Sequence, residues 1–287
     1  MPHARLGVVM PCFNETEWVE KSVEALRDAA ARADWPVDVL VVDDGSGEPT
    51  ARLLDDLAAR GLIRVLRQPN AGRFAARLAG LRAHDADYVL LLDARVLLHP
   101  DALATLRGHV DAEPASAWNA HVDVHTAGNP FAAFWSGLTK IGWRRYFARP
   151  RVVRFGTADF DAYPKGTGAF AAPRAVLLEA ASGFDSLFAD QRFASDDTKL
   201  LRNVAARTPI GIDPAFRVEY FGRDTASRWA KQVFFRGTTF VDGYVGTRGR
   251  AGALLGVLGV GLPLGVAAAL RWPRAAAVTA VAGCAAG

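Results

Sequence analysis

The sequence predicts an α/β fold with a mainly parallel, doubly wound sheet flanked by helices, followed by one or more C-terminal transmembrane segments. Short apolar runs alternate with amphipathic helical patterns through about the first 115 residues. Such alternation implies right-handed crossovers between parallel strands. Near the C-terminus, residues 251–270 carry no charged side chain, and about 20 such residues are needed to cross the hydrocarbon layer of a bilayer.

The first part of the chain contains repeated strand and helix patterns. Strands are expected at residues 6–10, 37–42, 63–66 and 88–92. Helices are expected to open near Asn14 and Glu15, at Pro49 and Thr50, at Arg73, and after Pro100. In the helix that opens at Arg73, the apolar positions should face the sheet, whereas Arg73, Arg77 and Arg82 should face outward.

After residue 115 this alternation fades and aromatic side chains become frequent. Residues 131–147 are crowded with them, and Lys140, Arg144 and Arg145 lie in the same segment. Two interpretations remain open: an interfacial helix whose cations face anionic lipid, or a core helix of the second half. Residues 223–237 predict another amphipathic helix. It lies near a membrane, closes a ligand pocket with its cations, or packs as an ordinary helix.

The uncharged run at residues 251–270 is the candidate membrane span. Its Ala and Gly content and its central Pro263 lower its hydrophobicity, so a buried hairpin is the alternative. Arginines flank the run on both sides, and their distribution favours a cell-membrane protein whose N-terminal domain faces the cytoplasm. Residues 275–287 are also mainly apolar but too short to span.

Composition excludes several classes of protein. The chain has 287 residues, about half of them apolar, which is enough for a full hydrophobic core. The net charge of +4 is mild and the arginines are scattered, so we expect a phosphate-bearing ligand or an anionic membrane rather than nucleic acid. Cys12 and Cys284 show neither zinc-ligand nor disulfide spacing. No Gly-x-Gly-x-x-Gly turn or glycine-rich basic loop follows the first strand, which argues against an oxidoreductase and a nucleotidyltransferase.

Acidic residues stand where the predicted strands end. The run 88–92 stops at Asp93, and the run 37–42 stops at Asp43 and Asp44. Because parallel strands deliver their carboxyl ends to one edge of a sheet, these acids should meet at a ligand-binding edge. In the trio that starts at Asp93, the third position is occupied by Arg95, although a second acid would be expected there.

Four motifs in this order resemble the family 2 glycosyltransferases, which have the GT-A fold. They are Pro11-Cys12-Phe13-Asn14-Glu15, Val41-Val42-Asp43-Asp44-Gly45-Ser46, Asn70-Ala71-Gly72 and Leu92-Asp93-Ala94-Arg95. The resemblance resumes at Gly183-Phe184-Asp185 and at Ser195-Asp196-Asp197-Thr198-Lys199-Leu200, and it covers most of residues 5–240. It implies a donor-binding half at 1–115 and an acceptor-binding half at 116–247, and the uncharged run adds a membrane segment at 248–287.

The resemblance also implies a nucleotide-diphosphate sugar as donor. The residues that it assigns to donor binding are Pro11, Phe13, Asn14, Glu15, Asp43, Asp44, Arg73, Asp93 and Arg95. Phe13 to Glu15 would line the base, and Asp43 or Asp44 would meet the base or ribose, unless Asp44 to Ser46 form only a turn. Arg73, at a helix N-terminus, would face the phosphates or remain solvated.

In the family, the trio at Asp93 holds a divalent cation, either magnesium or manganese. Because Arg95 replaces the second acid, three cases remain open. Asp93 holds the metal with other groups, Arg95 itself supplies charge to the diphosphate, or Arg95 forms an ion pair elsewhere. We hypothesise that the metal is retained.

On the acceptor side, the resemblance assigns the general base to Asp197, with Asp196 as the neighbour that orients it or binds acceptor. The alternative is that the two acids cap a helix. The turn at residues 165–170, expected before a helix, would lie beside the sugar or acceptor. Thr225 replaces the Gln of the Gln-x-x-Arg-Trp pattern found in processive members.

The expected protein is therefore a membrane-anchored, inverting, non-processive glycosyltransferase that acts on a lipid-linked or cell-envelope glycan. The alternative function is a catalytically impaired scaffold protein that binds nucleotide sugars at the membrane.

Overall fold

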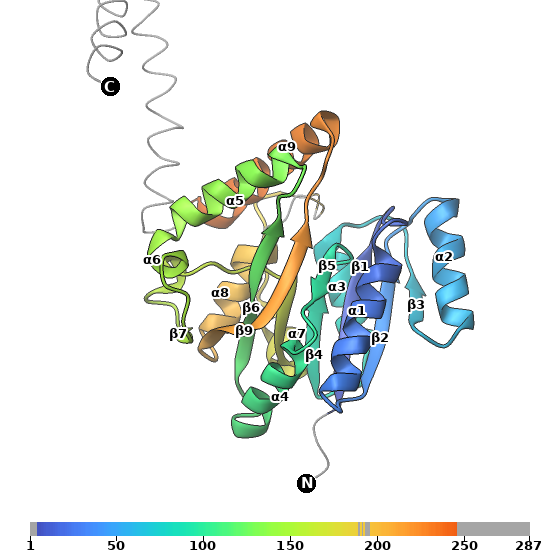
Figure 1. The fold of residues 1–287 in the computed structure, drawn as a ribbon, viewed down its shortest axis with the longest axis horizontal. Helices are drawn as coiled ribbons and strands as arrows, with labels where there is room; N and C mark the ends of the chain where they lie inside the picture. The colour runs from blue at the N-terminus through green and yellow to red at the C-terminus, as the bar shows by residue number, and fades with distance from the viewer. Residues whose placement is uncertain (1–4, 189, 191, 193–195, 246–287) are drawn as a thin grey trace, which may run out of the picture. The chain divides into compact units, whose positions relative to one another are not determined.

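The computed structural model describes residues 5–245 except 189, 191 and 193–195 (Figure 1). The chain divides into two compact units, Met1–Thr239 and Phe240–Gly287. The first unit contains the sheet and the candidate site. Most of the second unit, including the predicted membrane span at 251–270, lies outside the described residues.

One mixed sheet runs through the described part of the first unit. Its strand order is β3-β2-β1-β4-β8-β6-β9-β5, and β7 pairs with β9. The strands are β1 (Leu6–Cys12), β2 (Val37–Asp43), β3 (Arg64–Arg67), β4 (Tyr88–Leu92), β5 (Val96–Leu98), β6 (Ala117–His125), β7 (Val153–Phe155), β8 (Ala169–Pro173) and β9 (Ile210–Phe221). The four strands β1 to β4 pair in parallel, as the sequence predicts.

The second half of the sheet mixes both directions. Strand β8 is antiparallel to β4 and β6, whereas β6 and β9 pair in parallel. Strands β5 and β7 are antiparallel to β9. The α/β prediction is therefore confirmed, and its mainly parallel character holds for the first half of the sheet.

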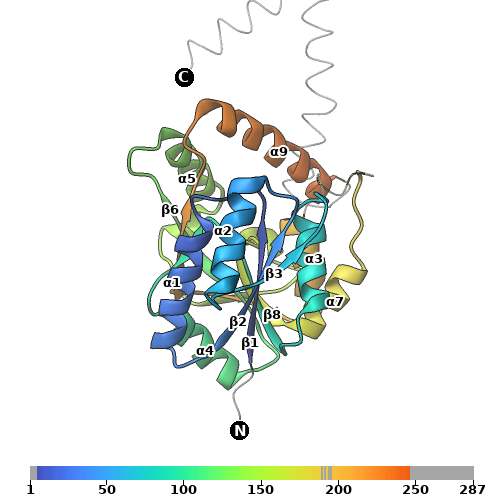
Figure 2. The same ribbon diagram turned by 90° about the vertical axis from the view of Figure 1, so that its right-hand side faces the viewer.

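Helices cover both faces of the sheet (Figure 2). They are α1 (Val19–Arg32), α2 (Glu48–Ala59), α3 (Arg73–Ala83), α4 (Ala102–Ala112), α5 (Pro130–Gly142), α6 (Arg144–Phe147), α7 (Arg174–Ser182), α8 (Leu201–Ala205) and α9 (Ala226–Tyr244), with short helices η1 (Phe160–Ala162) and η3 (Asp196–Leu200). Helices α1, α2 and α4 contribute to one hydrophobic core, and α3, α7 and α8 contribute to the other.

The two cores follow from the alternation of side chains along each strand. In β1, Val8 and Met10 belong to one core and Val9 to the other. Because all seven residues of β1 are buried, the strand needs apolar side chains on both faces. This explains why it appears in the sequence as an unbroken apolar run.

The turn at residues 165–170 leads to a different element from the one predicted. We expected a helix after it, but Ala169–Pro173 forms β8, and α7 begins only at Arg174. Strand β8, which consists of apolar residues, lies between β4 and β6 and pairs with both strands. Because β4 and β6 lie on either side of β8, the sheet is continuous across residue 115, and the division there into donor and acceptor halves stays a prediction.

Within the described residues, no helix is both long enough and apolar enough to cross a membrane.

Helix α3 approaches the sheet closely at Gly80, which suggests a test of its packing. A Cβ at this position would overlap the Cγ1 atom of Val9 and lie 3.0 Å from the Cγ2 atom of Val42. We expect Gly80→Ala to lower the free energy of unfolding by about 1–3 kcal/mol, as overpacked cores do.

Gly108→Ala in α4 is the matched control, because nothing lies within 4 Å of its added Cβ. It should raise the free energy of unfolding by about 0.5–1 kcal/mol, the usual gain of Ala over Gly inside a helix. Urea unfolding measures both. If the two variants shifted the midpoint in the same direction, the close packing of α3 would be disproved.

Candidate functional site

The candidate site lies at the edge of the sheet where β1, β2 and β4 end. Their last residues are Cys12, Asp43 and Leu92. The loops that follow β1 and β2 are bonded together. The Asn14 amide donates to Ser46 Oγ at 3.0 Å, and Asn14 Oδ1 accepts from the Gly47 amide at 2.8 Å. The topology therefore brings together three of the motif segments, as the sequence predicts.

The carboxylate of Asp44 holds the loop that precedes α3. It accepts from the amides of Ala71 and Gly72, both at 2.9 Å, and from Gln68 Nε2 at 2.7 Å. Asp44 is almost fully buried. These amides at the start of α3 therefore already face a carboxylate of the protein. Gly72 allows the turn because its φ of 92° is strained for other residues.

Asp43 ends β2 beside an open pocket. Its Oδ1 accepts from the Ser46 amide at 2.9 Å, whereas the turn considered from the sequence began at Asp44. The pocket has a volume of about 340 Å³ and is lined by Asp43, Gly45, Ser46, Ala51, Arg67, Gln68 and Pro69. It is a concave surface at the carboxyl ends of β2 and β3, beside one of the two acids predicted to meet the base or ribose.

The residues from Pro11 to Glu15 that are predicted to bind the donor differ in how exposed their side chains are. Pro11 is buried inside β1, whereas the side chain of Phe13 is 46% exposed. Asn14 adopts a left-handed conformation with a φ of 56° and uses its side chain to hold the β2 loop. Glu15 is paired with arginines. Phe13 and Asn14 are both exposed, but the Asn14 side chain is used by the β2 loop, so Phe13 is the one with an exposed apolar side chain.

Asp93 lies against two arginines of α3. Arg77 Nη2 donates to Asp93 Oδ1 at 2.5 Å, and Arg73 Nη1 lies 3.9 Å from Asp93 Oδ2. The Arg77 side chain is 1% exposed, so the prediction that it faces outward is wrong. A guanidinium is tolerated there because it pairs with a carboxylate and lies 3.4 Å from the carbonyl oxygen of Thr167. The side chain of Arg73 is 40% exposed.

The second acid of the site, Asp197, comes from the segment just before α8. Its Oδ1 accepts hydrogen bonds from the amide of Thr167, at 2.9 Å, and from the Thr167 hydroxyl. Residues 166–168 run past both acids, since a Cβ on Gly166 would lie 4.0 Å from Asp197 Oδ1 and one on Gly168 would lie 3.4 Å from Asp93 Oδ2. These hydrogen bonds therefore connect Asp197 to a turn that lies 30 residues earlier in the sequence. The side chain of Asp196 lies outside what the structure describes.

The electrostatic environment keeps Asp197 ionised. Burial raises its pKa, but the charges of Arg73 and Arg77 and the hydrogen bonds from Thr167 outweigh burial and lower the pKa to about 2, from an ordinary value of 3.8. Because the folded value is the lower one, this carboxylate stabilises the fold above about pH 4. That contribution is lost as the pH falls from about 4 towards 2.

Arg95 forms the ion pair that was the third of our three cases. Its Nε donates to Glu15 Oε2 at 2.7 Å, and Glu15 Oε1 accepts from Arg223 Nη2, also at 2.7 Å. The guanidinium of Arg95 also lies over the ring of Trp18, 5.5 Å from its centroid. Arg95 is 8% exposed. It therefore joins the loop after β1 to the segment that leads into α9.

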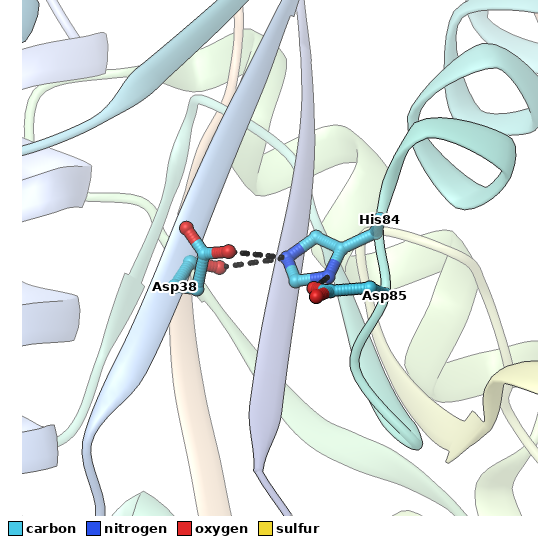
Figure 3. A group of neighbouring side chains, drawn as sticks. All are labelled: Asp38, His84 and Asp85. Carbon is cyan, nitrogen blue, oxygen red and sulfur yellow. Dashed lines mark hydrogen bonds and ion pairs between the residues drawn. The ribbon is translucent and has the colours of Figure 1, made fainter.

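The side chains around Asp93 do not fit a divalent cation. Both of its oxygens face guanidinium groups, and the position of the second acid is taken by Arg95. Among the described residues, one trio of possible metal ligands comes close together: Asp38, His84 and Asp85 (Figure 3). Asp38 lies near the start of β2, at the opposite end of that strand from Asp43.

His84 in that trio has a structural explanation. Its Nδ1 accepts from the Ala86 amide at 3.1 Å, which assigns the proton to Nε2, and Nε2 lies 3.0 Å from the carbonyl oxygen of Asp38. The ring is buried, and it fills the space where a Cβ on Gly7 would stand. Both ring nitrogens are thus used by the fold.

Comparison with known proteins gives a family match. The family model described as Glycosyl transferase family 2 matches residues 7–165, which is more than half of the chain. The undecaprenyl-phosphate 4-deoxy-4-formamido-L-arabinose transferase of Pectobacterium atrosepticum is 32% identical over 104 residues, covering 35% of this chain and 32% of that protein. The same-named protein of Pseudomonas fluorescens is 30% identical over 104 residues, covering 35% and 30%. The chain thus spans about a third of the length of these relatives.

Solved structures agree on the fold. The crystal structure of S. aureus TarS 1-349 in complex with UDP-GlcNAc has a TM-score of 0.58 and 12% sequence identity, and the match covers 84% of this chain and 68% of that chain. The complex of the same fragment with UDP has a TM-score of 0.56 and 13% identity, and the match covers 84% and 67%.

The Glu15–Arg95 pair gives a testable prediction. Arg95→Met keeps most of the side-chain volume but leaves the nearly buried carboxylate of Glu15 with Arg223 alone. We expect the free energy of unfolding in urea to fall by about 1–3 kcal/mol, because a buried charge loses one of its partners.

Arg64→Met is the control, since Arg64 pairs with Asp38 while its side chain is 51% exposed. It should change stability little, as exposed ion pairs do. Adding Glu15→Gln to Arg95→Met should recover part of the loss. Equal effects of Arg95→Met and Arg64→Met would show that the Glu15–Arg95 pair has no structural role.

Proposed function

The chain belongs to glycosyl transferase family 2, and we propose that it transfers a sugar from a nucleoside-diphosphate sugar to a hydroxyl acceptor at the edge of the sheet described above. One observation carries this proposal. Asp93 and Asp197 lie far apart in the sequence but flank the same turn, with Arg73 and Arg77 beside them. Two acids and two arginines at the carboxyl edge of an α/β sheet suit a reaction that binds a diphosphate and removes a proton.

We propose that the donor lies with its base near the 340 Å³ pocket beside Asp43 and its diphosphate near Arg73. Arg73 suits this role because its side chain is 40% exposed and already next to the acids. Its guanidinium also lies 5.1 Å from the ring centroid of Phe235, which helps to hold it in position. A guanidinium binds phosphate oxygens through charge-assisted hydrogen bonds.

Positive charge for the departing diphosphate then comes from the arginines of the chain. The family resemblance predicts a divalent cation at Asp93, and that prediction stays untested. Because both oxygens of Asp93 face Arg73 and Arg77, we derive no step through a metal.

Asp197 is the proposed general base. A carboxylate whose pKa is about 2 is ionised at neutral pH but is a weak base. The negative charge of a diphosphate bound at Arg73 offsets part of the positive charge that lowers this pKa. Donor binding should therefore bring the pKa of Asp197 back towards its ordinary value. The base is thus strengthened when the donor is present.

In the proposed reaction, the acceptor oxygen attacks the anomeric carbon as Asp197 takes its proton. The bond from that carbon to the phosphate oxygen breaks, and the electron pair leaves with the nucleoside diphosphate. A single displacement of this kind inverts the anomeric configuration. We propose one transfer per binding event, because Thr225 replaces the Gln of the processive pattern.

We propose a lipid-linked or cell-envelope acceptor. The names of the relatives, which include undecaprenyl phosphate, support this class of acceptor. The uncharged run at 251–270 supports attachment to the cell membrane, with the first unit on the cytoplasmic side. The catalytically impaired scaffold is the second candidate, and the observation in its favour is Arg95 in place of an acid.

Replacing the proposed base separates these two candidates. In Asp197→Asn, we expect transfer from a panel of nucleotide sugars to lipid-linked saccharides that carry free hydroxyl groups to fall by roughly 10²- to 10⁴-fold, because the proton acceptor is lost. Release of nucleoside diphosphate measures the rate. Asp111→Asn in α4, on a carboxylate paired with Arg107, is the control and should keep full activity. Nucleotide binding by the wild-type chain without any release would instead support the scaffold.

Replacing the proposed phosphate ligand tests the source of positive charge. In Arg73→Gln, the affinity for nucleoside diphosphates should fall roughly tenfold or more, as expected when a charge-assisted hydrogen bond is lost. Arg82→Gln, at the other end of α3, should bind normally. Isothermal titration with and without a chelator measures both variants and the wild type. Wild-type binding that is lost in chelator and restored by manganese would overturn the arginine proposal and support the metal at Asp93.

A further inference from the structure

Helix α5 exposes a stripe of apolar side chains. Phe134, Leu138 and Ile141 are 51%, 51% and 73% exposed. Their spacing of four and three residues places them on one face of the helix. The face towards the protein carries Ala132 and Ser136, both buried. Helix α5 therefore turns small side chains towards the core, whereas these three large apolar side chains point away from it.

Helix α9 packs beside α5 and extends this surface. The Trp229 ring contacts the rings of Phe131 and Phe134, with centroids 5.4 and 5.7 Å apart. Arg236 lies over the ring of Trp135 at 4.3 Å. On α9, Phe234 is 68% exposed and Val233 is 37% exposed. We call the set Phe134, Leu138, Ile141, Val233 and Phe234 the α5–α9 face.

Cations predominate in the segments that form the α5–α9 face, and Asp224, just before α9, pairs with Arg228 at 3.8 Å. Residues 126–158 contain six Lys or Arg side chains and no Asp or Glu, and residues 225–239 contain three and none. Lys140, Arg144, Arg145 and Lys231 are exposed. A surface that combines large apolar side chains with an excess of cations fits an anionic partner that has an apolar interior.

The topology puts this face at the same edge of the sheet as the candidate site. Helix α5 follows the end of β6, and α9 follows the end of β9. Strands β6 and β9 are parallel to each other, and β6 runs in the direction of β4 because both are antiparallel to β8. Both helices therefore lie beyond the carboxyl ends of the strands, on the side away from the start of β1 (Figures 1 and 2).

We propose that the α5–α9 face rests on an anionic phospholipid bilayer, with its apolar side chains at the boundary of headgroups and acyl chains and its cations on lipid phosphates. The sequence after α9 supports a bilayer over a protein partner, because it continues into the uncharged run at 251–270. The inference does not rest on the proposed transferase activity. If that activity holds, the docked face turns the candidate site towards acceptors in the bilayer.

A fluorescent probe in the full chain tests this proposal without interference from any separate membrane anchor. An environment-sensitive dye is attached at Ile141→Cys in a Cys284→Ala background, where Cys12 is 1% exposed and protected from the dye. The protein is placed in nanodiscs that contain phosphatidylcholine with or without phosphatidylglycerol. We expect the emission to shift to the blue, and brominated acyl chains to quench it, when phosphatidylglycerol is present.

Val152→Cys is the matched control, because Val152 is also apolar and 55% exposed. It precedes β7, which pairs with the start of β9, so it lies away from the carboxyl edge. Its emission should remain that of a dye in water. Arg144→Glu with Arg145→Glu should reverse the shift at Ile141→Cys.

Two results would overturn the proposal. In one, the dye at Ile141→Cys stays as exposed to water as the dye at Val152→Cys in every nanodisc. In the other, the shift requires two copies of the chain in one nanodisc, which would mean that the α5–α9 face packs against a second copy.

Discussion

The buried guanidinium of Arg77 is the constraint on which the rest of the site depends. Arginine cannot lose its charge in a protein, so a buried Arg77 requires a carboxylate partner. Asp93 fills this need from the end of β4, which fixes α3 against the central strands. The close approach at Gly80 belongs to the same packing. One turn earlier on α3, Arg73 is then held at the edge of the sheet.

A second ion-pair network fixes the loops around this centre. Glu15 binds Arg95 and Arg223 at once, so it connects the loop after β1, the end of β4 and the segment before α9. Asp44 does the same for the end of β2 and the loop before α3. Glu15 and Asp44, which the sequence presents as candidate donor ligands, therefore hold loops of the protein together. Asp93 and Asp197 are left as the acids beside the exposed arginine.

The sequence predicts the first half of the sheet well because each strand there is buried on both faces and each helix has a clear apolar period. It also predicts that Asp43 and Asp93 lie at one edge, since parallel strands end together. It misses the burial of Arg77, because charged side chains usually face solvent and the partner lies 16 residues away. The contact between Thr167 and Asp197 spans 30 residues, and no local pattern encodes it.

Strand β8 was missed for a related reason. A short run of Ala and Phe is compatible with a helix or a strand, and only its pairing with β4 and β6 decides between them. The pair of Arg95 with Glu15 was one of three open cases, and burial of both side chains selects it.

The short outer strand β3 has a consequence for the behaviour of the chain in solution. In the described sheet, β3 ends one side of the strand order and has four residues, with Arg64 and Arg67 at its two ends. An unpaired strand edge invites other chains to add to it, and charged side chains on a short strand discourage such additions. The apolar strands behind β3 are thereby shielded from intermolecular pairing, which should favour the separate molecule over aggregation.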